Sequence, residues 1–380
     1  MRVEEPARWA CIRWGGALLL GFGLAACVAS PASTTVPPTS SVLPTVAIPV
    51  VSTSTSSFTT PTADTAELKP RIFIASEATD SIQVWQGEPP AFIASIPVGD
   101  FPHNLSASNT GRWIASANRH AGTLSIVDAA TLQEIERIRV GASPHDLGWA
   151  PDDAQLYVTH EAEDTLAVID TATWTEVERL PVGLPQHDLS LSPDGREIWA
   201  TFVGYRGIVI IDRAALKVIE RLTDFAHGSH DVTFVPERGE AWVTSSGFIG
   251  DASQIDPFVL IFSTQTRQLL DSRPLGIYPF HSAKRFRDGP FVPEGPARVW
   301  YSDRGLGGVM AVDTATRTVV AKIETGRAPF HLSFGPNGLL YVANHDDATF
   351  SVIDPEAQTV LHTLDVAPDP HGIVVVAAPR

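Results

Sequence analysis

The feature that most constrains the fold is a unit of about 42 residues that repeats from residue 71 to residue 380. Each unit holds four short apolar runs separated by turn residues. Pro193-Asp194-Gly195 is typical of a tight hairpin between the first two runs, and Asp170-Thr171-Ala172-Thr173 of a turn between the last two. Four short strands in a unit of this length predict a blade of a β-propeller.

Histidines at the start of successive units give the number of blades. They are spaced 42, 42, 43, 51, 50 and 40 residues apart and are His103, His145, His187, His230, His281, His331 and His371. We therefore predict an all-β, seven-bladed propeller made of four-stranded antiparallel blades.

The two ends of the repeat region predict how the ring closes. Residues 71–98 hold the last three strands of a blade, whereas 371–376 form a first strand with nothing after it. Pairing the C-terminal strand with the N-terminal three would complete the seventh blade and remove open sheet edges.

The repeats resemble the YVTN-type β-propeller family, most clearly in Tyr157-Val158-Thr159-His160 and Tyr341-Val342-Ala343-Asn344. The resemblance covers about 310 residues, the whole predicted folded part, and it is specific for fold. Similar propellers occur in surface-layer proteins, in lactonases, in the haem-binding domain of a nitrite reductase and in the copper-cluster domain of nitrous oxide reductase. The resemblance therefore leaves the function open.

The chain before the repeats predicts export and anchoring. Residues 1–27 resemble a bacterial lipoprotein signal, in which the apolar run from Gly15 to Ala26 leads into Leu24-Ala25-Ala26-Cys27. That run is too short to cross a bilayer as a helix. We expect lipidation at Cys27; the alternative is an ordinary secretory signal. Residues 28–70 are rich in Ser, Thr and Pro and predict an extended tether, leaving 71–380 for the propeller.

Charge and motifs exclude several function classes. The net charge of −16 argues against nucleic acid as a partner. The sequence has no Walker-type phosphate loop, no Gly-x-Ser-x-Gly elbow and no cysteine pair with metal spacing. We therefore expect an exported protein, held by its lipid to the outer side of a bacterial membrane, with binding favoured over catalysis.

The recurring histidines predict a cluster at one mouth of the central channel. The start of the first strand and the end of the second lie at the same face of a blade, so three further histidines join the seven: His120, His160 and His345. Acidic residues accompany them, including Asp146, Asp188, Asp231 and Glu161. Imidazole is a common ligand of transition metals.

The predicted metal ligands are a subset of this cluster: His103, His145, His187, His230 and His371. His281 and His331 follow Pro-Phe, so they stand one residue out of step, and a one-residue shift turns a strand side chain to the other face. A transition metal or haem is the candidate cofactor. The alternative is that duplication copied a structural histidine, as in WD-repeat propellers.

Three functions remain open from the sequence. The first is a lipid-anchored module that binds a protein or a small ligand. The second is a metal- or haem-linked redox protein that uses the channel mouth. The third, a lactonase-like hydrolase, rests on the resemblance alone.

Overall fold

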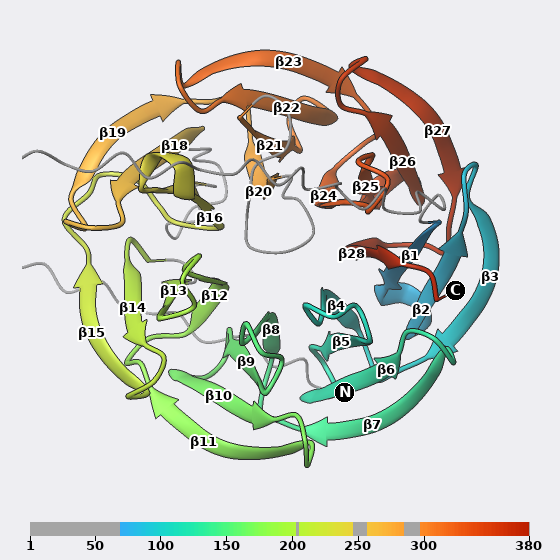
Figure 1. The fold of residues 1–380 in the computed structure, drawn as a ribbon, viewed down its shortest axis with the longest axis horizontal. Coiled ribbons are helices and arrows are strands. Elements are labelled where there is room, and N and C mark those ends of the chain that lie inside the picture. Colours follow the sequence, from blue (N-terminus) through green and yellow to red (C-terminus); the bar gives the residue numbers. More distant parts are fainter. Residues whose placement is uncertain (1–68, 203–204, 246–256, 285–296, 380) are drawn as a thin grey trace, which may run out of the picture. The chain divides into compact units, whose positions relative to one another are not determined.

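The computed structural model describes residues 69–202, 205–245, 257–284 and 297–379. These residues form seven four-stranded antiparallel sheets arranged in a ring, which confirms the predicted seven-bladed β-propeller (Figure 1). The predicted signal, Cys27 and the tether up to residue 68 lie outside the described residues. No helix in the described ranges is long and apolar enough to span a membrane.

The strands of each blade follow one another outward from the centre of the ring (Figure 1). The innermost strands are β4 (Pro102–Ala107), β8 (Pro144–Trp149), β12 (Gln186–Leu191), β16 (Val232–Val235), β20 (Pro279–Lys284), β24 (Pro329–Phe334) and β28 (Pro370–Ala377). The second strands are β5 (Trp113–Asn118), β9 (Gln155–His160), β13 (Glu197–Phe202), β17 (Glu240–Ser245), β21 (Arg298–Asp303), β25 (Leu340–Asn344) and β1 (Pro70–Ser76).

The two outer positions complete each sheet. The third strands are β6 (Thr123–Asp128), β10 (Thr165–Asp170), β14 (Ile208–Asp212), β18 (Phe258–Ser263), β22 (Gly308–Asp313), β26 (Thr349–Asp354) and β2 (Ser81–Gln86). The outermost strands are β7 (Gln133–Arg139), β11 (Thr175–Pro181), β15 (Lys217–Leu222), β19 (Leu269–Pro274), β23 (Thr318–Glu324), β27 (Thr359–Asp365) and β3 (Ala91–Pro97). Short 3-10 turns cover Glu77–Thr79, Pro236–Arg238 and His345–Asp347.

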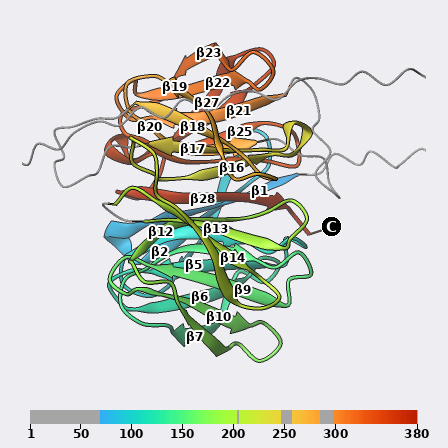
Figure 2. The same cartoon turned by 90° about the vertical axis from the view of Figure 1, so that its left-hand side faces the viewer.

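The ring closes as the sequence predicts. Strand β28 pairs antiparallel with β1, where Ile72 lies opposite Val375 and Ile74 opposite Ile373. The two strands run side by side in the edge-on view (Figure 2). This seam joins the two ends of the propeller by backbone hydrogen bonds, so it replaces two free sheet edges.

The apolar core is divided among the blade boundaries. Seven clusters of buried side chains are present in the described chain, and each joins two neighbouring blades. Large aromatic side chains from the second strands fill these clusters, because side chains on the face of one blade must bridge the gap to the next blade. Trp199 and Trp242 are at most 1% exposed. The apolar core therefore lies between the blades, and polar side chains line much of the central channel.

Candidate functional site

The seven repeat histidines form a closed ring around the channel. The innermost strands bring them to the centre (Figure 1), and five of them are less than 9% exposed, namely His103, His145, His230, His281 and His371. Each imidazole contacts the next. In order from the His103–His145 pair round to His371–His103, the ring centroids are 4.8, 4.0, 4.2, 4.9, 3.6, 5.0 and 3.7 Å apart.

Two of these histidines reach the ring from a different register. The backbone N–H of His281 donates to Ser302 Oγ, just as that of Asp188 donates to Thr201 Oγ1. His281 therefore occupies the position equivalent to Asp188, and Phe280 occupies the position equivalent to His187. The predicted one-residue offset is present, but it does not remove the side chain from the cluster, because the first strand bulges at this point.

The three further histidines have different surroundings. His345 reaches the ring, with its Nε2 3.6 Å from Glu77 Oε2 and its centroid 6.4 Å from that of His371. The His120 ring stacks on Phe101 and its side chain is 57% exposed.

His160 is buried away from the ring. Its two nitrogens lie 2.8 Å from the Val140 carbonyl and 3.1 Å from the Thr165 carbonyl. The structure therefore does not bring His160 to the channel mouth as the sequence predicts, because its side chain contacts one backbone carbonyl of its own blade and one in the connection from the preceding blade.

A cavity of about 240 Å³ opens onto the ring. Sequence reasoning missed part of its lining. Phe280 and Phe330 were not predicted from the sequence as lining residues. Both belong to the Pro-Phe-His segments with the offset register, and that offset could have indicated that a phenylalanine replaces the histidine at this position. Arg119 forms an ion pair with Glu161 at the end of the second strand of its neighbour blade. The full lining is Glu77, Phe101, His103, Arg119, His145, Glu161, His187, Phe280, His281, Phe330, His345 and His371.

Hydrogen bonds fix which ring nitrogens face the cavity. His103 Nδ1 contacts the Glu77 carboxylate, and His145 Nδ1 lies 3.2 Å from the His187 carbonyl oxygen. A carbonyl and a carboxylate only accept, so both Nδ1 atoms carry the proton. The two Nε2 atoms then hold lone pairs, and they face each other at 3.2 Å. Two facing lone pairs repel each other unless a metal ion or a proton lies between them.

Glu161 and His187 extend the same group of atoms. Glu161 Oε1 lies 3.6 Å from His145 Nε2 and 3.5 Å from His187 Nε2. His187 Nδ1 lies 3.1 Å from Asp188 Oδ1. Glu161 Oε1 therefore lies within 3.6 Å of two imidazole Nε2 atoms, one of which also faces His103 Nε2 at 3.2 Å, and each of the three imidazoles has an oxygen near its other nitrogen.

Burial keeps most of the ring neutral. It lowers the pKa of His103, His145, His230, His281 and His371, and it brings the pKa of His331 to about 4. Burial also acts against the charged form of His187, but the nearby carboxylates of Asp188 and Glu161 outweigh it and raise the pKa of this histidine. Neutral imidazole is the form that binds metal.

Asp188 is the charged acid of the site. Burial acts to raise its pKa, but His187, His281 and His230 outweigh this effect and hold the pKa well below its ordinary value. In Asp146 and Asp231, burial and the charge of Asp188 raise the pKa to about 7 and about 8. Of the three carboxyl groups, Asp188 is the one whose ionised form the site favours.

Several polar atoms of the cluster have no hydrogen-bond partner among the residues that the structure describes. They are buried, so leaving them unpaired costs free energy unless a ligand satisfies them. They include both nitrogens of His230, both carboxylate oxygens of Asp188, and one nitrogen each of His187, His281, His331 and His371. Three groups have ligand atoms close enough to share an ion: Glu77–His103–His371, His145–His187–Asp188 and Asp188–His230–His281.

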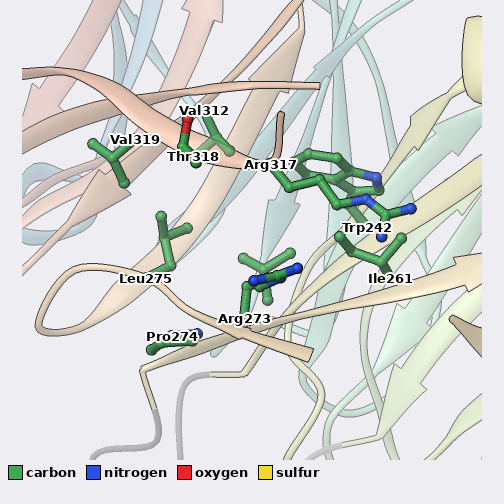
Figure 3. Close-up of a pocket in the computed structure, with 10 residues that line it drawn as sticks. Trp242, Ile261, Arg273, Pro274, Leu275, Val312, Arg317, Thr318 and Val319 are labelled. Atoms are coloured by element: carbon green, nitrogen blue, oxygen red, sulfur yellow. The ribbon is translucent and has the colours of Figure 1, made fainter. Parts of the chain in front are cut away.

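A second cavity, of about 250 Å³, lies between the fourth and fifth blades (Figure 3). Its lining is mainly apolar, with Leu275 and Val319 among its residues, and it also includes the side chains of Arg273 and Arg317 (Figure 3). Both arginines already pair with Asp271. The described residues of this cavity hold no cluster of metal-ligating side chains, so the histidine ring is the stronger candidate site.

Comparisons with known proteins support the fold and leave the chemistry open. No protein-family model matches the sequence, and no curated protein matches it. The YVTN-type resemblance therefore stays a prediction.

Solved structures that are similar to this chain include three from different sources. One is a functionally unknown protein from Desulfotomaculum acetoxidans, with 12% identity and a TM-score of 0.67 over 81% of this chain and 99% of that one. Another is Kuenenia stuttgartiensis hydrazine synthase, with 16% identity and a TM-score of 0.61 over 72% and 89%. The Cps50 (Swd1) β-propeller domain of Myceliophteria thermophila has 11% identity and a TM-score of 0.59 over 76% and 92%. At these identities the likeness shows the propeller fold alone.

Proposed function

We propose that this protein binds a transition-metal ion at the channel mouth, through Nε2 of His103, His145 and His187 with Glu161 beside them. The observation that carries the proposal is the pair of facing lone pairs on His103 and His145, 3.2 Å apart. Two nitrogens bound to one tetrahedral ion at about 2.0–2.1 Å are roughly 3.3–3.4 Å apart, so the pair already has the spacing of two ligands.

The oxygens behind the imidazoles support the same role. Glu77 lies at His103 Nδ1 and Asp188 at His187 Nδ1. Metal-binding histidines commonly donate their second N–H to a carboxylate or a carbonyl, which holds the ring orientation and strengthens the ligand. A histidine copied for structure alone needs partners in its own blade, whereas Glu77 and the His187 carbonyl come from blades other than those of His103 and His145. Asp188 follows His187 in the same strand.

The donor set favours Zn, Cu, Fe or Ni. Imidazole with one carboxylate suits these ions, and the two cysteines of the chain, Cys11 and Cys27, both precede the propeller. Haem fits poorly. The cavity of about 240 Å³ is smaller than the pockets of roughly 300–1,000 Å³ that hold drug-sized ligands, and neighbouring imidazoles are already in contact.

The propeller fold is consistent with a binding module, and the proposed module binds a metal ion on the outer side of a bacterial membrane. The lipoprotein-like signal and the tether of residues 28–70 support this location. The cavity beside the proposed site leaves room for one small exogenous ligand, as a catalytic metal site requires. Redox chemistry with a copper or iron ion is the second candidate function, favoured by the donor set.

The test is the metal content of the full chain, purified without a polyhistidine tag and dialysed separately against Zn(II), Cu(II) and Co(II). We expect stoichiometric metal, and we expect His187→Gln and Glu161→Gln to lower its affinity. His362→Gln is the matched control, because that histidine pairs with Glu88 on the outer side of the propeller. A folded wild-type protein that refuses all three ions would overturn the proposal.

A further inference from the structure

Asp188 breaks the structural pattern of its own repeat position. Three acidic residues follow a ring histidine at the same register, and in each the backbone N–H donates to a threonine hydroxyl of the second strand. The pairs are Asp146 with Thr159, Asp188 with Thr201 and Asp231 with Thr244.

The carboxylates of two of the three hold neighbouring blades together. Asp146 Oδ2 accepts the Leu189 backbone N–H at 2.9 Å, and Asp231 Oδ2 accepts the Ser282 backbone N–H at 2.7 Å. Asp188 makes no such bond, and neither of its buried oxygens has a hydrogen-bond partner in the described chain. Its carboxylate therefore does not make the bond to the next blade that Asp146 and Asp231 make from the equivalent position.

The two oxygens of Asp188 face two different pairs of imidazoles. Oδ1 lies 3.1 Å from His187 Nδ1 and 3.5 Å from His145 Nδ1, on the side of the proposed mouth ion. Oδ2 lies 3.3 Å from His230 Nδ1 and 3.5 Å from His281 Nδ1. Both distances from Oδ2 are close to roughly 3.3 Å, which is the distance between two ligand atoms bound to one tetrahedral ion.

The second pair is buried and short of partners. His230 is 6% exposed and His281 is 4% exposed. Both nitrogens of His230 and Nε2 of His281 lack a hydrogen bond within the described residues. The offset register explains the geometry, because His281 occupies the position of an aspartate and so approaches Asp188 from the side opposite His187.

We propose that Asp188 Oδ2, His230 and His281 bind a second metal ion, and that Asp188 links it to the mouth ion through His187. This inference rests on the proposed metal-binding function and adds a paired centre to it. Asp188 Oδ1 faces Nδ1 of His187 at 3.1 Å, and Nε2 of that histidine is a proposed ligand of the first ion, while Oδ2 is a proposed ligand of the second. Loading one site therefore changes the other through a single carboxylate.

The experiment counts Co(II) ions in the full chain by titration and mass spectrometry. We expect two Co(II) per chain in the wild type and one in His230→Gln and in His281→Gln. Asp188→Asn should lose the second ion and weaken the first about 10- to 100-fold, the usual effect of removing an outer partner of a histidine ligand. Asp146→Asn is the matched control, because its carboxylate holds a blade boundary, and it should keep both ions.

The outcomes separate this inference from the proposed function. One ion in the wild type, lost in His187→Gln and kept in His281→Gln, would overturn the pair and leave the proposed function standing. No ion at all would overturn both. A measurement on the wild type avoids dependence on folded variants: two equivalents of Cu(II) should give a half-field electron paramagnetic resonance signal from coupled ions. Isolated Cu(II) signals alone would count against the linked pair.

Discussion

His103 Nε2 lies 3.2 Å from His145 Nε2, and the second nitrogen of each ring faces an oxygen that only accepts. A cation at this point relieves the repulsion and satisfies both lone pairs. Because it binds the folded protein and has no preformed site in the unfolded chain, it also stabilises the fold.

We therefore expect metal to raise the thermal stability of the chelator-treated protein. At a free ion concentration of 100 times Kd, the free energy of unfolding should rise by about 2.7 kcal/mol. For a domain of this size the midpoint should move up by several degrees. Differential scanning calorimetry with and without Zn(II) measures the shift. A midpoint that does not respond to any transition metal would contradict this prediction.

Glu77 should act through His103. Its carboxylate contacts His103 Nδ1 from the 3-10 turn after β1, and it is 8% exposed. Replacing it with Gln keeps the shape but loses the charge, so we expect metal affinity to fall about 10- to 100-fold. Glu163→Gln is the control, since Glu163 pairs with Arg179 outside the ring. Equal affinities in the two variants, measured by calorimetric titration, would argue against a positioning role.

Gly372 should be intolerant of a side chain. A Cβ at this position would lie 2.6 Å from the Leu105 backbone nitrogen and 2.8 Å from the His103 carbonyl oxygen. Because both atoms are backbone, Gly372→Ala must push β28 away from β4, at a cost of about 1–3 kcal/mol. Urea denaturation measures this loss. A variant as stable as the wild type would mean that the boundary between the seventh and first blades yields easily.

Glu240 should make stability depend on acid pH. Burial acts to raise its pKa, but hydrogen bonds from Trp242, Arg238 and Arg317 outweigh burial and hold the pKa below the ordinary value of 4.5. The folded pKa is depressed, so the stabilisation is present above pH 4.5 and is lost as the pH falls through the folded pKa.

Glu240→Gln should therefore destabilise the protein at pH 7 by about 1.5–3 kcal/mol, the range for hydrogen bonds to charged groups. The difference from the wild type should shrink as the pH falls below 4.5. Glu134→Gln, which removes an exposed pair with Arg137, should cost no more than about 1 kcal/mol. Urea denaturation at several pH values tests both; a difference that does not vary with pH would contradict the linkage.

The anchoring proposal has its own test in a bacterial host. The full chain should incorporate a labelled fatty acid and sediment with membranes. Cys27→Ser should lose both properties, whereas Cys11→Ser should keep them, because Cys11 precedes the expected cleavage point. Labelling that survives Cys27→Ser would overturn the lipoprotein prediction.

The repeat made most of the fold predictable from sequence. A period of about 42 residues with four apolar runs specifies a blade, and seven copies with complementary ends specify a closed ring. Because blades are related by rotation about the channel, a histidine that recurs once per repeat must come to one face of that channel. The gathering of His103, His145 and His187 therefore follows from the local pattern alone.

Only the tertiary structure decided what each of these groups faces. Asp146 and Asp188 have the same repeat position, yet one bonds the next blade and the other lies among imidazoles. His281 reaches the ring although its register is offset, and His160 does not reach it although its position suggested that it would. Contacts of this kind join residues in different blades, and their side-chain rotamers are chosen by packing and by charges that are distant along the chain. The repeat pattern determines the backbone position of each residue, and packing in the assembled ring determines what its side chain contacts.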